Sequence, residues 1–158
     1  MLSIRSATEA DAKSILDLRK ASIRAFGPEG YHDEQVDAWA AQPLGVAPYL
    51  ESIRDESKYV IVAEEDGEVA GFGRLELDTG VLSAVYVHPE YARNGLGSSL
   101  LSHLESVARN VGLDSLSLHA SLNAADFYEA NGYERIETVE HEVFGGVELA
   151  CVEMWRDL

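Results

Sequence analysis

The sequence predicts an α+β fold in which helices flank a mixed, mostly antiparallel twisted sheet, and three observations support this. The first third of the chain carries helical patterns after one short strand. Residues 58–87 are rich in β-branched residues and contain turn signals at 65–68 and 78–80, as expected for a three-stranded antiparallel meander. Strand and helix patterns then alternate up to a last hairpin. The 158 residues contain no repeat and no Pro- or Gly-rich linker, so one domain over residues 1–158 is expected.

The N-terminal third predicts one strand and three helices. Thr8 is a typical N-cap followed by acidic residues, and apolar residues at helical spacing then continue up to the break at Gly27-Pro28. Asp33 is the expected cap of the second helix. The expected elements are a strand at Leu2–Ser6, a helix from Thr8 to the glycine, a loop at 29–32, and short helices at 33–41 and 48–54.

The remaining two thirds predict the rest of the sheet and one long helix. In that helix Leu100, Leu101 and Leu104 share one face, and Gly112 marks its end. The last two strands are expected to pair around Phe144-Gly145-Gly146. The elements are strands at 59–63, 69–77 and 81–87, a helix at 97–111, a strand at 115–120, a helix at 124–131, and a strand pair at 133–143 and 147–155.

The charge balance is strongly acidic, with 28 Asp and Glu against 12 Lys and Arg and a formal net charge of -16. Such a surface repels the phosphates of nucleic acid and anionic lipid, so neither is an expected partner. A solvated acidic surface, adapted to high intracellular salt, is one interpretation, because salt screens self-repulsion. It predicts a melting temperature that rises with KCl. The alternative is an acidic patch that steers a cationic substrate.

Other features of the composition narrow the setting. Cys151 is the only cysteine, so neither an intrachain disulfide nor a cysteine-based metal cluster is expected, and the histidines lack metal-ligand spacing. No apolar run approaches the roughly 20 residues that span a bilayer. The N-terminus does not resemble a signal peptide. A cytoplasmic protein without a metal is therefore expected, and a homodimer is compatible with the sequence.

A glycine turn carries the first chemical signal. Strand 81–87 leads through His88-Pro89 to Arg93-Asn94-Gly95-Leu96-Gly97-Ser98, which opens the long helix. Glycines let a backbone approach a ligand closely, and the free N–H groups and dipole of a helix start favour an anion. The turn matches neither the P-loop nor the dinucleotide fingerprint. Taken by itself it is either an ordinary helix start or an anion site.

The turn resembles motif A of the GCN5-related N-acetyltransferase (GNAT) superfamily, in which [QR]-x-x-G-x-[GA] wraps the pyrophosphate of acetyl-CoA. This chain has Ala92 where the family usually has Gln or Arg, and Arg93 stands one place later. The resemblance implies acetyl-CoA as co-substrate. The implied cofactor-binding residues are Val85, Tyr86, Val87, Arg93, Asn94, Gly95, Leu96, Gly97 and Ser98.

A second segment, residues 119–134, taken alone is ordinary core packing around Phe127 and Tyr128. It also resembles motif B of the same superfamily, A-x-x-F-Y-x-x-x-G-[FY], at every specified position from Ala124 to Tyr133. The resemblance implies that Tyr128 is the general acid that protonates the departing thiolate, and that Asn123 contacts the cofactor. Residues 31–39 further resemble a segment of small bacterial acetyltransferases similar to YafP, in which the early helices cover the acceptor site.

The resemblance implies direct attack of an amine on the thioester, which needs a base or a water chain to take the amine proton. Many relatives carry an acid near position 83, where this chain has Ser83. Glu76 and His119 are the candidate bases, but the sequence favours the simpler interpretation of Glu76 as one surface acid among many and of His119 as an ordinary strand residue. The expected acceptor is a small amine or amino-acid-like metabolite. The alternatives are a protein N-terminus or lysine, or a non-catalytic acyl-CoA-binding module.

Overall fold

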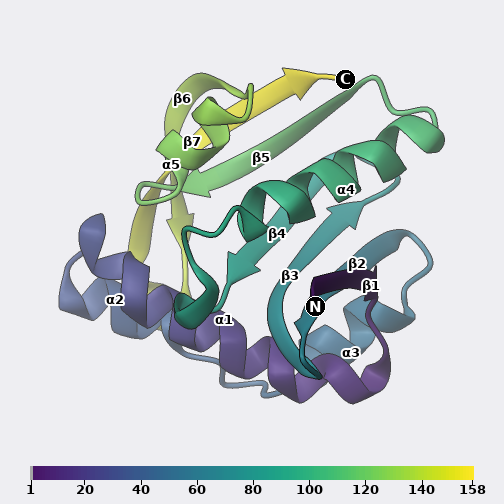
Figure 1. The fold of residues 1–158 in the computed structure, drawn as a ribbon. Helices are drawn as coiled ribbons and strands as arrows, with labels where there is room; N and C mark the ends of the chain where they lie inside the picture. The colour runs from purple at the N-terminus through teal and green to yellow at the C-terminus, as the bar shows by residue number, and fades with distance from the viewer. Residues whose placement is uncertain (1) are drawn as a thin grey trace.

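The computed structural model describes residues 2–158, in which seven strands form one sheet with helices on both faces (Figure 1). The α+β prediction is confirmed. All neighbouring strands are antiparallel except β4 and β5, which are parallel. Along the chain the strands are β1 (Leu2–Ser6), β2 (Lys58–Glu65), β3 (Glu68–Glu76), β4 (Val81–Val87), β5 (Ser115–Ser121), β6 (Glu134–Glu142) and β7 (Glu148–Asp157). Their spatial order in the sheet is β1-β2-β3-β4-β5-β7-β6.

The helices lie on opposite faces of this sheet (Figure 1). One face carries α1 (Ala12–Phe26), α2 (Asp33–Ala40) and α3 (Ala47–Arg54), and the other carries α4 (Leu96–Asn110) and α5 (Ala125–Ala130). Two N-caps differ from the sequence prediction. Thr8 caps a short 3₁₀ turn that precedes α1, and His32 rather than Asp33 precedes α2 as its cap. Within residues 2–158 no helix is long and apolar enough to cross a membrane.

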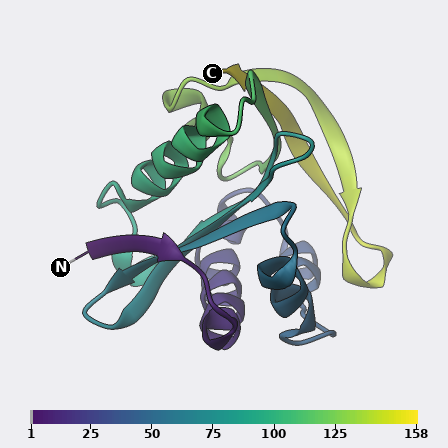
Figure 2. The same cartoon turned by 90° about the vertical axis from the view of Figure 1, so that its right-hand side faces the viewer.

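The sheet is split between β4 and β5. These strands pair at a single position, Val81 with Ser117, and then diverge, as the two views in Figures 1 and 2 show. On the other side of β4 a bulge interrupts the pairing with β3, because Arg74 pairs with Ala84 while Leu75 pairs with Leu82. Ser83 is thus the extra residue. A bulge bends its strand and re-aims the residues that follow, so it directs 84–86 toward the gap.

Two glycines of β3 allow α4 to lie directly on the sheet. A Cβ built on Gly71 would come within 2.9 Å of Leu100 Cδ1, and one on Gly73 within 2.7 Å of Leu104 Cδ1. Both leucines are fully buried in the main hydrophobic core. This close approach fixes the start of α4 at the end of β4, which brings the glycine turn to the gap in the sheet.

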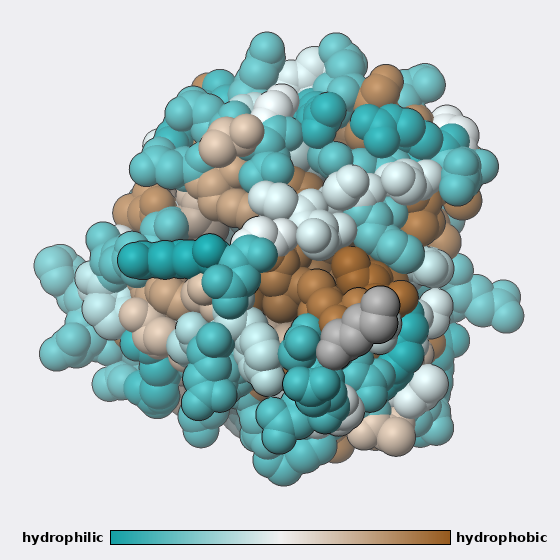
Figure 3. Space-filling view, viewed as in Figure 1, coloured by the Kyte–Doolittle hydropathy of each residue, from teal (hydrophilic) through white to brown (hydrophobic). Residues whose placement is uncertain are grey.

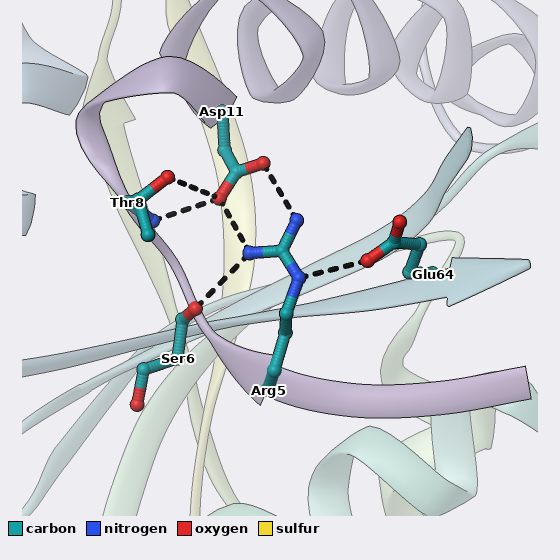
Figure 4. Close-up of polar contacts among 5 residues, drawn as sticks. All are labelled: Arg5, Ser6, Thr8, Asp11 and Glu64. Atoms are coloured by element: carbon teal, nitrogen blue, oxygen red, sulfur yellow. Dashed lines mark hydrogen bonds and ion pairs between the residues drawn. The ribbon is translucent and has the colours of Figure 1, made fainter. Parts of the chain in front are cut away.

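Two polar networks join elements that are distant in sequence. Arg5 on β1 donates to Asp11 through two hydrogen bonds of 2.8 and 2.9 Å and to Glu64 on β2 at 2.8 Å, while the Asp11 carboxylate also accepts from the Thr8 backbone (Figure 4). These bonds lower the pKa of Asp11, chiefly through Arg5. Charge-assisted bonds of this kind are stronger than neutral ones. The network holds the entry to α1 against the sheet.

The second network is buried beneath α4. Glu105 is 6% exposed and accepts a hydrogen bond from Tyr133 Oη at 2.8 Å and one from Arg156 Nη1 at 3.0 Å. Arg156 also donates to the carbonyl of Asn131 after α5. A buried carboxylate needs such partners because burying an unpaired charge is costly. The face of the molecule seen in Figure 3 is mainly hydrophilic, with hydrophobic residues gathered toward its middle.

Candidate active site

A cavity of about 870 Å³ lies at the gap between β4 and β5. Both faces of the sheet contribute to its lining. Residues of β4 and β5 form its middle, the turn before α4 and the start of α5 close one side, and α1, α2 and the β6–β7 hairpin close the other. The split sheet therefore produces an opening that reaches from the α4 face to the α1 face.

The glycine turn lies at the α4 side of this cavity. Gly95 is the N-cap of α4 with a left-handed φ of 79°, and Arg93 is also left-handed at 64°. Such a conformation is strained in a non-glycine residue and is typical of functional sites. The first helical bond runs from Ser99 N to Gly95 O, so the N–H groups of the preceding residues have no acceptor within the helix. This geometry suits an anion.

Asn123 supplies an unsatisfied polar atom to the cavity. Its Oδ1 is buried and has no hydrogen-bond partner within residues 2–158. Buried polar atoms are nearly always paired, so an orphan in a cavity wall indicates a ligand N–H. The position is fixed by close packing, since a Cβ on Gly30 would lie 3.2 Å from the Asn123 nitrogen. Together with the free N–H groups of the glycine turn, this acceptor fits a ligand that carries both phosphate and amide groups.

Tyr31 fixes the segment between α1 and α2 over the same region. Its hydroxyl donates to the Ala150 carbonyl of β7 at 2.6 Å and accepts from Leu122 N at 3.0 Å. Burial raises the pKa of Tyr31 to about 12, although the Leu122 bond opposes the shift. Its ring packs edge-on against Trp39 of α2. The segment between α1 and α2 is thereby tied to β7 and to the loop before α5.

Tyr128 lies in α5 and lines the cavity. Only 8% of the residue is exposed, and its hydroxyl has no hydrogen bond to any group in residues 2–158. Burial raises the pKa of Tyr128 well above that of a free phenol, and the neighbouring phenol of Tyr86 adds to the shift. The sequence interpretation used an ordinary phenol, with a pKa of about 10. The buried phenol instead remains protonated over the whole physiological range and offers a free donor.

Tyr86 of β4 lines the cavity and packs against the core on the α1 side of the sheet. Its ring stacks on Phe72 at 5.4 Å between centroids, and Arg19 Cζ of α1 lies 5.5 Å from the ring centroid. This is the distance of a cation–π contact. Arg19 is also within electrostatic reach of the Tyr49 phenol. Tyr86 therefore links a cation on the α1 side with Tyr128 across the gap.

The structure brings most of the predicted site residues to the cavity. Among the predicted cofactor-binding residues, those that line it are Val85, Tyr86, Val87, Arg93, Gly95, Gly97, Ser98 and Asn123. Asn94 does not line it, and the Leu96 side chain is 4% exposed within the main core. Leu96 can therefore contribute only its backbone. Ala92, where the family motif usually has Gln or Arg, also lines the cavity.

The two candidate bases are in different surroundings. Glu76 lies outside the cavity lining. Its carboxylate accepts a hydrogen bond from Ser83 Oγ at 3.2 Å and forms an ion pair with Lys58 Nζ at 3.7 Å. His119 lines the cavity, and its Nδ1 lies 2.5 Å from Nε2 of His141 on β6. No group of three metal-ligating side chains occurs within residues 2–158, so the described part of the chain offers the pair no further metal ligands.

Sequence reasoning missed Arg19 and His141. Arg19 occupies an ordinary helical position, and only the packing of α1 against β4 shows that its side chain faces the cavity. His141 reaches His119 because β7 lies between β5 and β6. One signal in the sequence could have indicated His141: side chains alternate between the two faces of a strand, and His141 lies in the strand that begins after Tyr133.

Comparisons with known proteins agree with this geometry. Residues 29–154 match the family model described as an acetyltransferase (GNAT) domain. The chain is 32% identical over 124 residues to the L-amino acid N-acyltransferase MnaT of Escherichia coli, covering 70% of this chain and 65% of that protein. It is 23% identical over 145 residues to the N-acetyltransferase YafP of the same organism, covering 91% and 89%.

A solved structure gives the same result. The crystal structure of a GCN5-related N-acetyltransferase from Rhodopseudomonas palustris superposes with a TM-score of 0.89 at 28% identity, covering 99% of this chain and 95% of that one. The expected resemblance, including the likeness to YafP, is thus confirmed. The family transfers the acetyl group of acetyl-CoA to amines, and the chain belongs to this family, the GCN5-related N-acetyltransferases.

Proposed function

We propose that this enzyme transfers the acetyl group of acetyl-CoA to the primary amine of a small amine or amino-acid-like metabolite. The observation that carries the proposal is the cavity that joins the glycine turn, the Tyr128 hydroxyl and the α1 side of the sheet. The tie between Tyr31, which lines the cavity, and Ala150 of β7 supports a small acceptor, because it closes the cavity on the α1 side. The relation to an L-amino acid N-acyltransferase supports the same class.

The residues at the glycine turn fit the proposed cofactor. The N–H groups of Leu96, Gly97 and Ser98 and the guanidinium of Arg93 would hold the pyrophosphate, and Asn123 Oδ1 would accept from a pantetheine amide. The backbone of 85–87 borders the gap through which the thioester arm would pass. Acetyl-CoA, when bound there, supplies a thioester carbonyl that an amine can attack.

The transfer needs one proton removed and one supplied. As the amine nitrogen bonds to the acetyl carbon, the carbon–sulfur bond breaks and the amine loses a proton to a base. We assign Tyr128 as the acid that gives its proton to the leaving sulfur and regains one from solvent. Burial keeps the phenol protonated and available as a donor, and the same apolar surroundings would also raise the basicity of a thiolate that forms beside it.

His119 is the base that the geometry favours. It lines the cavity and contacts His141, and both residues are exposed, so a proton accepted at His119 has a path to solvent. An imidazole is suited to take a proton near neutral pH. Glu153 stands opposite His119 on β7 and also lines the cavity. Its carboxylate would stabilise the protonated pair.

A thiol-release assay with acetyl-CoA and a panel of amines tests the function. We expect release with at least one small amine, and a rise in melting temperature on adding acetyl-CoA. If acetyl-CoA neither binds nor stabilises the protein, the proposed function is wrong.

A variant pair tests the base. His119→Gln is expected to lower kcat at pH 7 by roughly 10²-fold, with partial recovery at higher pH where more of the amine is already neutral. Glu76→Gln serves as control, because Glu76 lies outside the cavity, and kcat should stay near that of the wild type. Equal losses in the two variants would contradict the assignment of His119.

A further inference from the structure

Arg19 is a cation without a carboxylate in a protein that has carboxylates in excess. Of the twelve Lys and Arg, eight form ion pairs with carboxylates of residues 2–158. Arg19 has no such partner within these residues. It is half-buried on α1 and lines the cavity. A partly desolvated guanidinium is costly unless an anion pairs with it, so its position indicates a ligand anion.

The surroundings of Arg19 hold the guanidinium without neutralising it. The ring of Tyr86 lies 5.5 Å from Cζ, and the phenols of Tyr86 and Tyr49 are within electrostatic reach. Tyr49 is itself engaged, since its hydroxyl donates to Gln42. A ring and two phenol side chains orient a planar cation, but neither phenol is a carboxylate that would pair with its charge. An incoming carboxylate can therefore form the two parallel hydrogen bonds that an arginine offers.

Arg19 and Arg93 are separate anion sites. Arg93 precedes α4 on one face of the sheet, while Arg19 belongs to α1 on the other face (Figure 1). Both line the same cavity, and neither has a carboxylate partner within residues 2–158. If Arg93 holds the pyrophosphate, Arg19 faces the end of the cavity where the acceptor enters.

The place of Arg19 relative to the reaction is given by Tyr86. Arg19 lies over the Tyr86 ring, and the Tyr86 phenol is near enough to Tyr128 to affect its pKa. A group bound to Arg19 therefore lies in the same cavity as Tyr128, on the side of Tyr86 that faces α1. In an α-amino acid the amine and the carboxylate are attached to the same carbon, so a carboxylate held by Arg19 keeps the amine within this cavity.

We propose that Arg19 binds the carboxylate of the acceptor, so that the acceptor is an amino acid whose α-amine is acetylated. This inference rests on the proposed function and narrows it from amines in general to carboxylate-bearing amines. Glu29 and Glu142, which are exposed, and Glu153, which is half-buried, also line the cavity, and their carboxylates attract the ammonium group of an entering amino acid. These carboxylates and Arg19 together select a zwitterion.

The test compares matched acceptors in the thiol-release assay. The twenty common L-amino acids are each assayed beside the corresponding carboxamide and the decarboxylated amine, which keep the side chain but lack the carboxylate. The wild type should have a kcat/KM at least about tenfold higher for its best amino acid than for the two matched compounds, the value of one charged hydrogen bond or more.

Arg19 variants show whether that preference depends on the guanidinium. In Arg19→Gln the KM of the best amino acid should rise roughly 10- to 100-fold, while the values for the carboxamide and the amine change little. Arg19→Lys should recover part of the loss. Lys20→Gln is the matched control, because it removes the same charge from the exposed neighbouring position of α1 and should leave all three acceptors unaffected.

The outcomes separate the two proposals. Acetyl-CoA must stabilise Arg19→Gln as it does the wild type, which shows that the variant is folded and that its cofactor site is intact. Three results would refute the carboxylate site while the acetyltransferase function stands. The wild type could accept the carboxamide or amine as well as the amino acid, it could acetylate polyamines but no amino acid, or Arg19→Gln could lower kcat/KM equally for all acceptors. Failure of acetyl-CoA to bind the wild type refutes the proposed function instead.

Discussion

Two neighbouring tyrosines allow a direct test of which residue serves catalysis and which serves stability. Tyr128 and Tyr133 lie with their ring centroids 5.8 Å apart, and both are at least nine-tenths buried. The Tyr128 hydroxyl faces the cavity without a hydrogen bond to residues 2–158, whereas the Tyr133 hydroxyl donates to Glu105 at 2.8 Å. The same change, Tyr to Phe, therefore removes a free donor at one position and a buried bond at the other.

The expected magnitudes follow from these contacts. Tyr128→Phe breaks no bond in the folded protein, so its free energy of unfolding should change by less than about 0.5 kcal/mol. Loss of a general acid should lower kcat by roughly 10²- to 10⁴-fold. Tyr133→Phe removes a hydrogen bond to a charged group, worth about 1.5–3 kcal/mol. For a chain of this size that corresponds to a melting temperature lower by roughly 5 °C, with kcat little changed.

Three measurements on each variant separate the effects: kcat from thiol release at saturating acceptor, the acetyl-CoA dissociation constant from calorimetry, and the melting temperature. The affinity of Tyr128→Phe for acetyl-CoA should stay near that of the wild type. If this variant keeps kcat within about threefold, Tyr128 is not the general acid, given the usual size of such effects. A large loss of acetyl-CoA affinity would instead make its role structural. A catalytic loss in Tyr133→Phe at an unchanged melting temperature would contradict the assignment of Tyr133.

Two further predictions concern the glycine turn and alkaline pH. Gly97→Val should weaken acetyl-CoA binding about tenfold or more, because Gly97 lines the cavity, and it should also lower stability, because a Cβ there lies 3.2 Å from two ring atoms of Phe127 and overpacking costs about 1–3 kcal/mol. The control Gly112→Ala, with a φ of 88° and open space around it, should lower only the melting temperature. The pKa of Tyr31 is about 12 in the folded protein, against 10.0 for a free phenol, so above pH 10 the unfolded chain binds fewer protons and the free energy of unfolding falls. Between these pH values the free energy of unfolding of Tyr31→Phe, measured in urea titrations, should fall less steeply than that of the wild type, by about 1.4 kcal/mol per pH unit. The same slope in both proteins would contradict the raised pKa.

Local signals in the sequence predicted most of the elements. The meander from β2 to β4 follows from β-branched runs separated by turn residues, and the start of α4 follows from the glycine turn. The boundary error was small and had a physical reason. Leu96, predicted to lie before the helix, is its first residue because Gly95 takes up the left-handed conformation required of the cap.

The order of the strands in the sheet could not be predicted from such local signals. The last hairpin was expected from Phe144-Gly145-Gly146, but its second strand, β7, lies between β5 and β6. That order brings His141 to His119 and Glu153 opposite it, and no turn signal encodes it. The bulge at Ser83 was also unexpected, because it depends on which residues of β3 and β4 pair.

The acidic composition bears on the two arginines that line the cavity. At a net charge of -16, a lysine or arginine has many carboxylates within reach, and most of those described have taken one. Four cations form no ion pair within residues 2–158, and of these (Arg19, Lys20, Arg93 and Arg109) only Arg19 and Arg93 line the cavity, where the proposed function needs two anionic groups to be bound. At these two positions a carboxylate of the protein would compete with the proposed ligand for the same guanidinium.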